Sequence, residues 1–110
     1  MNTELNTKAD LSDLIENEQA VMVYFYSNNC APCVSLRPKV EELIKNNFPK
    51  LKLVFIDSVK HPDITGSYGI FSNPTLIVFL EGREYRRESK YISIPQLKEE
   101  IDRPYKLIFD

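Results

Sequence analysis

The sequence predicts an α/β domain of three layers (α/β/α), in which helices cover both faces of a mixed sheet of about four strands. Residues 21–26 and 51–56 are nearly continuous apolar runs, which is typical of strands that are buried on both faces. A helical pattern separates the two runs, so these strands are expected to lie parallel. The runs 75–80 and 83–88 are joined by a Glu81-Gly82 turn and predict an antiparallel hairpin at one edge of the sheet.

Length and composition limit the classes of protein to which the chain can belong. At 110 residues, of which 43% are hydrophobic, it is expected to form one domain, residues 1–110, with a core. A formal net charge of −2 gives no basic stripe for nucleic-acid phosphates. No apolar run approaches the roughly 20 residues of a membrane span, and residues 1–8 lack the apolar segment of a signal peptide. We therefore expect a cytoplasmic protein with no nucleic-acid or membrane partner, unless a leader has been removed.

Helical patterns lie before the first strand and between the later ones. Residues 8–18 form an amphipathic pattern, and Thr7 and Asp10 have the spacing of a capping box. After the second apolar run, a polar stretch leads into a short helix or turn at about 63–68.

The last helix is expected between two sequence signals. Ser93 has the character of an N-cap residue, and Gln96 stands at the reciprocal position of a capping box. Pro104 lacks the N–H group that a helix interior uses, so the helix is expected to end near residue 102. The apolar residues 105–110 are assigned to no element.

Cys30 and Cys33 directly follow the first apolar run and open a helical pattern that continues to about Asn46. Free N–H groups and the positive end of the helix dipole stabilise an anion at a helix start. The Cys30 thiol is therefore expected to ionise more readily than that of a free cysteine. Cys33 lies one turn away on the same side of the helix, and Pro38 is expected to kink the helix further along. This arrangement suits thiol–disulfide exchange better than zinc binding, which needs four ligands.

The sequence resembles the thioredoxin family over nearly its whole length. An apolar strand precedes the CxxC motif, a hairpin glycine (Gly82) follows a later strand, and the remaining motifs stand in the family's relative positions. These motifs are Cys30-Ala31-Pro32-Cys33, Pro38, and Tyr68-Gly69-Ile70 ahead of Asn73-Pro74-Thr75. The resemblance implies a thioredoxin-like fold and a redox-active disulfide that works without a cofactor or a metal.

The resemblance also implies a role for each residue of the site. Cys30 is expected to be the nucleophile that forms a mixed disulfide, and Cys33 the residue that resolves it. Pro74 is expected to be cis and to pack against the disulfide. The remaining residues are expected to support the pair (Ala31, Pro32, Pro38) or to contact substrate (Asn29, Phe71, Asn73, Thr75).

Several positions depart from the family pattern. Thioredoxins usually have Trp before the first cysteine, a hydrophobic residue before the cis-proline and Val-Gly in the rear recognition loop, where this chain has Asn29, Asn73 and Ser89-Lys90. A buried Asp and its Lys partner are replaced by Tyr24 and Leu53. A phenol is not a base at neutral pH, so the resolution step is expected to be slower than in a typical thioredoxin. The N-terminal strand is expected to be shortened or lost.

Three features have two interpretations each. Phe71 is either an exposed substrate contact that replaces the missing Trp or a core residue. His61, the only histidine, is expected to be an exposed loop residue, and a metal shared across a dimer is the alternative. The basic cluster of Arg83, Arg86, Arg87 and Lys90 is interleaved with Glu84 and Glu88, which indicates a solvated edge strand and not a binding patch.

The predicted function is that of a cytoplasmic protein disulfide reductase, a monomer that takes part in electron transport and cell redox homeostasis. Its expected partners are protein disulfide substrates and a reductase that donates electrons, such as thioredoxin reductase. The alternative is a thioredoxin-fold binding or adaptor module with one dedicated partner and little general reductase activity. The altered residues around the cysteines keep this alternative open.

Overall fold

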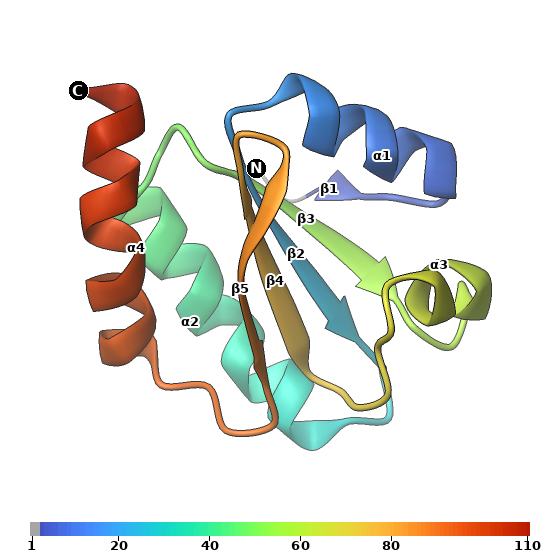
Figure 1. The fold of residues 1–110 in the computed structure, drawn as a ribbon. Helices are drawn as coiled ribbons and strands as arrows, with labels where there is room; N and C mark the ends of the chain where they lie inside the picture. Colours follow the sequence, from blue (N-terminus) through green and yellow to red (C-terminus); the bar gives the residue numbers. More distant parts are fainter. Residues whose placement is uncertain (1–2) are drawn as a thin grey trace.

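A computed structural model describes residues 3–110 and contains a five-stranded mixed sheet of order β1-β3-β2-β4-β5 (Figure 1). The strands are β1 (Thr3–Glu4), β2 (Ala20–Tyr26), β3 (Lys52–Asp57), β4 (Thr75–Leu80) and β5 (Arg83–Ser89). β1 and β2 lie parallel to β3, whereas β4 lies antiparallel to both β2 and β5. The predicted fold class is confirmed.

Helices cover both faces of the sheet, which makes the molecule three layers deep (Figure 1). The helices are α1 (Lys8–Asn17), α2 (Ala31–Asn47), α3 (Pro62–Ser67) and α4 (Ile94–Phe109). Alternate residues of β2 point to opposite faces. Met22 and Tyr24 are buried in the core under α2 and α4, whereas Val23 and Phe25 are buried in the core under α1 and α3. β2 is therefore apolar at every position because it lies in the middle of the sheet, where both of its faces are buried.

The N-terminal strand is not lost, and over the described residues it spans Thr3–Glu4, so the sheet has five strands and not about four. β1 pairs Thr3 with Val54 and Glu4 with Phe55, and the Leu5 N–H donates to the Phe55 carbonyl at 3.0 Å. Two polar residues carry no apolar pattern that would predict a strand. The strand is instead held by β3 and by the Glu4 carboxylate, which accepts from Tyr26 at 2.8 Å and from Arg37 at 2.9 Å.

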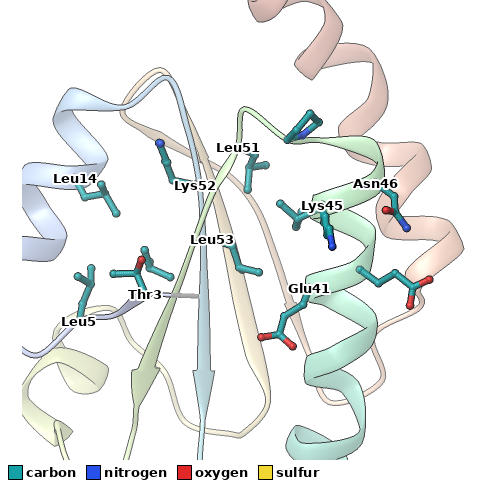
Figure 2. A pocket seen from close by; sticks show the side chains of 13 residues that line it. Thr3, Leu5, Leu14, Glu41, Lys45, Asn46, Leu51, Lys52 and Leu53 are labelled. Carbon is teal, nitrogen blue, oxygen red and sulfur yellow. The ribbon is translucent and has the colours of Figure 1, made fainter. Parts of the chain in front are cut away.

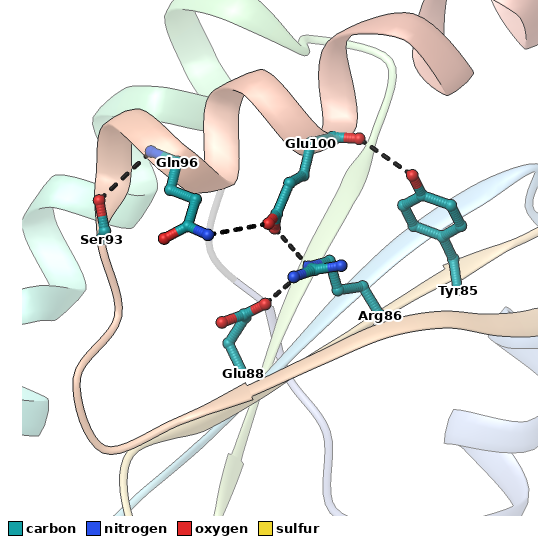
Figure 3. Close-up of polar contacts among 6 residues, drawn as sticks. All are labelled: Tyr85, Arg86, Glu88, Ser93, Gln96 and Glu100. Atoms are coloured by element: carbon teal, nitrogen blue, oxygen red, sulfur yellow. Dashed lines mark hydrogen bonds and ion pairs between the residues drawn. The ribbon is translucent and has the colours of Figure 1, made fainter.

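α4 does not end at Pro104, and this prediction was wrong. Proline cannot donate to the carbonyl four residues earlier, which in α4 belongs to Glu100. The Tyr85 hydroxyl of β5 donates to that carbonyl at 3.2 Å instead (Figure 3). The helix therefore continues to Phe109 with Pro104 inside it.

The apolar residues after Pro104 have partners that no local pattern shows. Tyr105 is buried, with its ring centroid 5.0 Å from that of Phe48 and 4.7 Å from that of Phe109. Its hydroxyl accepts from the Lys50 N–H at 2.9 Å. The last two turns of α4 thus close the core beside the C-terminal end of α2.

The start signals of the helices are confirmed in part. Thr7 accepts from the Asp10 N–H at 3.1 Å and Ser93 accepts from the Gln96 N–H at 3.3 Å, as N-cap residues do. The Gln96 side chain does not return to Ser93, however, because it donates to Glu100 (Figure 3). The Ser93–Gln96 pair therefore caps the helix without the reciprocal bond of a capping box.

The β4–β5 hairpin turns at Glu81-Gly82 as predicted. Both residues have positive φ, 54° and 81°, which is the conformation of a type I′ turn. β5 is the solvated edge strand that its charges predict. Arg87 pairs with Glu84 at 2.9 Å, and Arg86 pairs with Glu88 and also contacts the Glu100 carboxylate of α4 (Figure 3).

A cavity lies beside β1 and the start of β3. It has a volume of about 1030 Å³. Its lining includes Leu53 from β3, Lys45 from α2, and Leu5 and Leu14 from the N-terminal part of the chain (Figure 2). Neither cysteine is among the residues that line it. Over residues 3–110, no helix is long and apolar enough to cross a membrane.

Candidate active site

Cys30 and Cys33 form a disulfide at the start of α2, with their Cα atoms 5.3 Å apart. β2 ends at Tyr26, and a short turn brings Cys30 to the N-cap position of the helix. The Cys30 Sγ accepts from the Cys33 N–H at 3.2 Å. Pro32 fits the first helical turn because its missing N–H would have no partner there. The motif therefore places one sulfur at the positive end of a helix.

The two sulfurs differ in burial. The Cys33 side chain is 2% exposed, whereas Cys30 is partly exposed. Ala31 and Pro32, between them, are exposed, and Pro38 lies further along on the solvent side of α2. A target sulfur can thus approach Cys30 but not Cys33.

The loop before β4 lies directly against Cys30. The Asn73–Pro74 peptide bond is cis, which is the geometry that the resemblance implies. The Asn73 carbonyl oxygen lies 3.6 Å from the Cys30 Sγ. A disulfide sulfur carries no proton, but the reduced Cys30 thiol can donate to this oxygen. The Asn73 side chain is turned away to Ser58, whose hydroxyl donates to its Oδ1 at 2.9 Å.

The other residues that are expected to contact substrate differ in their exposure to solvent. Asn29 is exposed, and Phe71 is 94% exposed, so Phe71 is not a core residue. Thr75 is buried, and its hydroxyl donates to the Ser72 carbonyl at 2.7 Å. Any contact of Thr75 with substrate therefore has to come from its backbone.

Tyr24 lies behind the buried cysteine. Its side chain has no exposed surface, and its hydroxyl donates to the Cys33 carbonyl at 2.7 Å. Burial raises the pKa of Tyr24 to about 12, although the Arg37 guanidinium acts in the opposite direction. The phenol is therefore neutral and cannot accept a proton from Cys33 near neutral pH.

Arg37 is a neighbour of this site that sequence patterns did not single out. Its guanidinium lies 3.8 Å from the ring centroid of Phe55 and pairs with Glu4 at 2.9 Å and with Glu41 at 3.7 Å. The only sequence signal is its position four residues after Cys33, which places both on one side of α2. Arg37 thus places a half-buried cation between α2, to which it belongs, and the sheet residue Phe55.

A groove lies on the other side of Pro74 and was also missed. It has a volume of about 360 Å³, and Pro32, Leu36, Lys39, Pro74, Lys90 and Tyr91 are among the residues that line it. Lys90 has a φ of 63°, and its N–H donates to the Pro74 carbonyl at 3.1 Å. We call this hollow the lysine groove.

His61 is not brought to the cysteines. It stands before the first turn of α3, partly exposed, with its Nε2 3.2 Å from the Asn6 Oδ1. Within residues 3–110, no three His, Cys, Asp or Glu side chains gather as a metal site would require.

Similarity to known proteins extends over most of the chain. The thioredoxin family model matches residues 2–103. The chain is 25% identical to the thioredoxin-like protein YdfQ of Bacillus subtilis over 105 residues, which cover 96% of this chain and 93% of that protein. It is 30% identical to a thioredoxin of Alicyclobacillus acidocaldarius over 95 residues, which cover 86% of this chain and 90% of that protein.

Solved structures of thioredoxins have the same fold. The thioredoxin of Fasciola hepatica superposes with a TM-score of 0.82 at 32% identity, covering 92% of this chain and 97% of that one. A mutant thioredoxin of Halobacterium salinarum superposes with a TM-score of 0.83 at 24% identity, covering 94% and 89%.

Proposed function

This chain belongs to the thioredoxin family and is a thiol–disulfide oxidoreductase, and from this premise we propose that it reduces disulfide bonds of other proteins through a mixed-disulfide intermediate. Members of this family work without a bound cofactor. The redox-active group is the Cys30–Cys33 pair itself.

The proposed reaction begins with both cysteines reduced. The Cys30 thiolate attacks one sulfur of the target disulfide, the target S–S bond breaks, and the departing target sulfur takes up a proton. The Cys33 thiol then loses its proton and attacks the Cys30 sulfur, which releases the second target sulfur as a thiol. Two electrons and two protons pass from the cysteine pair to the target, and Cys30 and Cys33 are left as a disulfide.

One observation carries this proposal: the accessible Cys30 sulfur stands at a helix N-terminus beside the cis Asn73–Pro74 bond, with Cys33 buried behind it. The helix start favours the thiolate that must attack. No cationic side chain stands between the cysteines in Ala31-Pro32 to stabilise that thiolate further. This favours a reducing couple over an oxidising one.

The electron donor and the compartment are part of the same proposal. A new cycle requires a reductant for the Cys30–Cys33 disulfide, and a reductase of the thioredoxin reductase class fits the family. A reducing compartment such as the cytoplasm would keep the pair as a dithiol between cycles.

Three measurements test the proposal. The protein with excess dithiothreitol should reduce the disulfides of insulin faster than dithiothreitol alone, and Cys30→Ser should abolish the gain. Alkylation of the reduced protein near neutral pH should label Cys30 before Cys33, because Cys33 is buried. The variant Cys33→Ser should accumulate a mixed disulfide with its target. No gain over dithiothreitol, or first labelling of Cys33, would refute the proposal.

A dedicated adaptor remains the second candidate. The observation that favours it is Phe71, which is 94% exposed and precedes the loop that contacts Cys30. Exposed aromatic side chains beside a reactive group are typical of a specific partner surface. Fast turnover with dithiothreitol but slow turnover with thioredoxin reductase would indicate a dedicated electron donor, and no turnover with either would favour the adaptor.

A further inference from the structure

The lysine groove continues the surface on which a target would meet Cys30. Pro32 of the CxxC motif and the cis-proline Pro74 both line it, and the Asn73 carbonyl beside Cys30 belongs to the same loop. An extended segment advances about 3.3 Å per residue. A target segment whose cysteine reaches Cys30 therefore passes into or beside this groove within a few residues.

The charge of the groove is positive. Lys39 projects from α2 and Lys90 from the end of β5, and both are exposed. In the part of the chain that the structure describes, no carboxylate pairs with either lysine, and no acidic residue is among those that line the groove. Glu88 of β5, two residues before Lys90, is paired with Arg86. The two ammonium groups are thus available to a ligand.

The backbone holds Lys90 in place at the groove. Its left-handed φ of 63° is unfavourable for a residue with a side chain, and its N–H is fixed to the Pro74 carbonyl at 3.1 Å. Tyr91, the next residue, is 96% exposed and lines the same groove. The groove therefore joins an aromatic surface to two unpaired cations at a fixed position beside the cis-proline.

We propose that Lys39 and Lys90 are specificity-determining residues, which select target segments that carry an acidic side chain close to the attacked cysteine. This rests on the proposed disulfide reductase activity. The lysines do not take part in electron transfer. They bring an acidic segment to Cys30 by attraction of opposite charges, which acts mainly on the rate of association.

Two cyclic peptides with one internal disulfide test the proposal. They differ only in having two Glu or two Gln residues beside the attacked cysteine, and the rate constant of their reduction by the reduced protein is measured at low salt. Each rate constant is divided by that for dithiothreitol, because the charges also change the reactivity of the disulfide itself. The Glu peptide should react about two- to fivefold faster, which is the range of a surface ion pair. At about 1 M salt, where the Debye length is about 3 Å, this preference should disappear.

The double variant Lys39→Gln/Lys90→Gln should reduce both peptides at one rate. The matched control Lys8→Gln/Lys45→Gln removes the same charge from α1 and from the far end of α2, and should keep the preference. Equal reduction of 2-hydroxyethyl disulfide by both variants would show that their active sites are intact. Equal rates for the two peptides with the parent protein, or a preference that survives in the groove variant, would overturn this inference and leave the reductase activity standing. If neither peptide is reduced, the proposed function fails and this inference fails with it.

Discussion

At the scale of single residues, Tyr24 is the substitution with the clearest chemical consequence. Its hydroxyl is buried, neutral and bonded to the Cys33 carbonyl at 2.7 Å. It therefore holds the backbone of the resolving cysteine but cannot remove its proton. Cys33 has to lose that proton to water or to the departing target thiolate, and the pH dependence of the reaction is expected to follow the Cys30 thiol alone.

We expect Tyr24→Asp to speed resolution of the mixed disulfide near neutral pH and to lower the free energy of unfolding, because a buried carboxylate is a base but is costly to bury. The variant Tyr24→Asn is the matched control, because it opens the same space without a base. Single-turnover release of a target from the mixed disulfide measures the step. A folded Tyr24→Asp protein that is no faster than Tyr24→Asn would contradict this role for position 24.

Tyr24→Phe tests the hydrogen bond to Cys33 separately from the proton. At neutral pH, the variant should be less stable by about 1 kcal/mol, the usual net value of one hydrogen bond. Burial raises the pKa of Tyr24 from 10.0 to about 12, so the unfolded chain loses this proton before the folded protein does. The stability that the buried phenol contributes is thus complete below pH 10 and falls between pH 10 and about 12. In urea unfolding, the parent should lose its advantage over Tyr24→Phe across this interval.

At the scale of elements, α4 shows how a strand can compensate for a proline inside a helix. Pro104 leaves the Glu100 carbonyl without its helical donor, and the Tyr85 hydroxyl supplies one from β5. The pair also ties α4 to the edge of the sheet. Helix and edge strand therefore depend on each other for stability.

Pro104→Ala should raise the free energy of unfolding, by less than the roughly 3 kcal/mol that proline costs relative to alanine in a helix interior, because the Tyr85 hydroxyl already supplies a donor for the Glu100 carbonyl. Pro95→Ala is the control, because Pro95 lies in the first turn of the same helix, where proline is tolerated. Its effect should be small.

Tyr85→Phe should then cost less in the Pro104→Ala background than in the parent, because residue 104 regains an N–H for Glu100. A double-mutant cycle measured by urea unfolding gives this coupling. Equal costs of Tyr85→Phe in the two backgrounds would show that the hydroxyl does not compensate for the proline.

At the scale of the whole molecule, two cores on opposite faces of the sheet carry the fold, and the disulfide lies at the margin of one of them. Closing a loop of so few residues constrains the unfolded chain by only about 2 kcal/mol. We expect the reduced protein to keep its fold. Far-ultraviolet circular dichroism should be the same in both redox states, and urea should unfold both cooperatively. A reduced form without a cooperative transition would contradict this view.

The sequence predicts those parts of the molecule that local patterns determine. The central strands follow from continuous apolar runs, and the site from a CxxC motif at a helix start. The end of α4 was predicted wrongly because the sequence shows that Pro104 lacks an N–H group but not that the Tyr85 hydroxyl replaces it as the donor. Arg37 was missed for the same reason, since its guanidinium lies on Phe55, which is distant in the chain. Lys90 was placed in the recognition loop by the family resemblance, but no local pattern shows that its N–H donates to the Pro74 carbonyl.

The exposure of β1 has a consequence for the motions of the protein. Within residues 3–110, this strand contributes Thr3 and Glu4 and buries neither of them, and the cavity of Figure 2 borders it. Segments with few buried contacts open by themselves at a small free-energy cost, without unfolding the rest. The Leu5 amide should therefore exchange its proton with solvent far sooner than the amides of β2. Because Glu4 also pairs with Arg37, each such opening would briefly break this ion pair of the active-site helix.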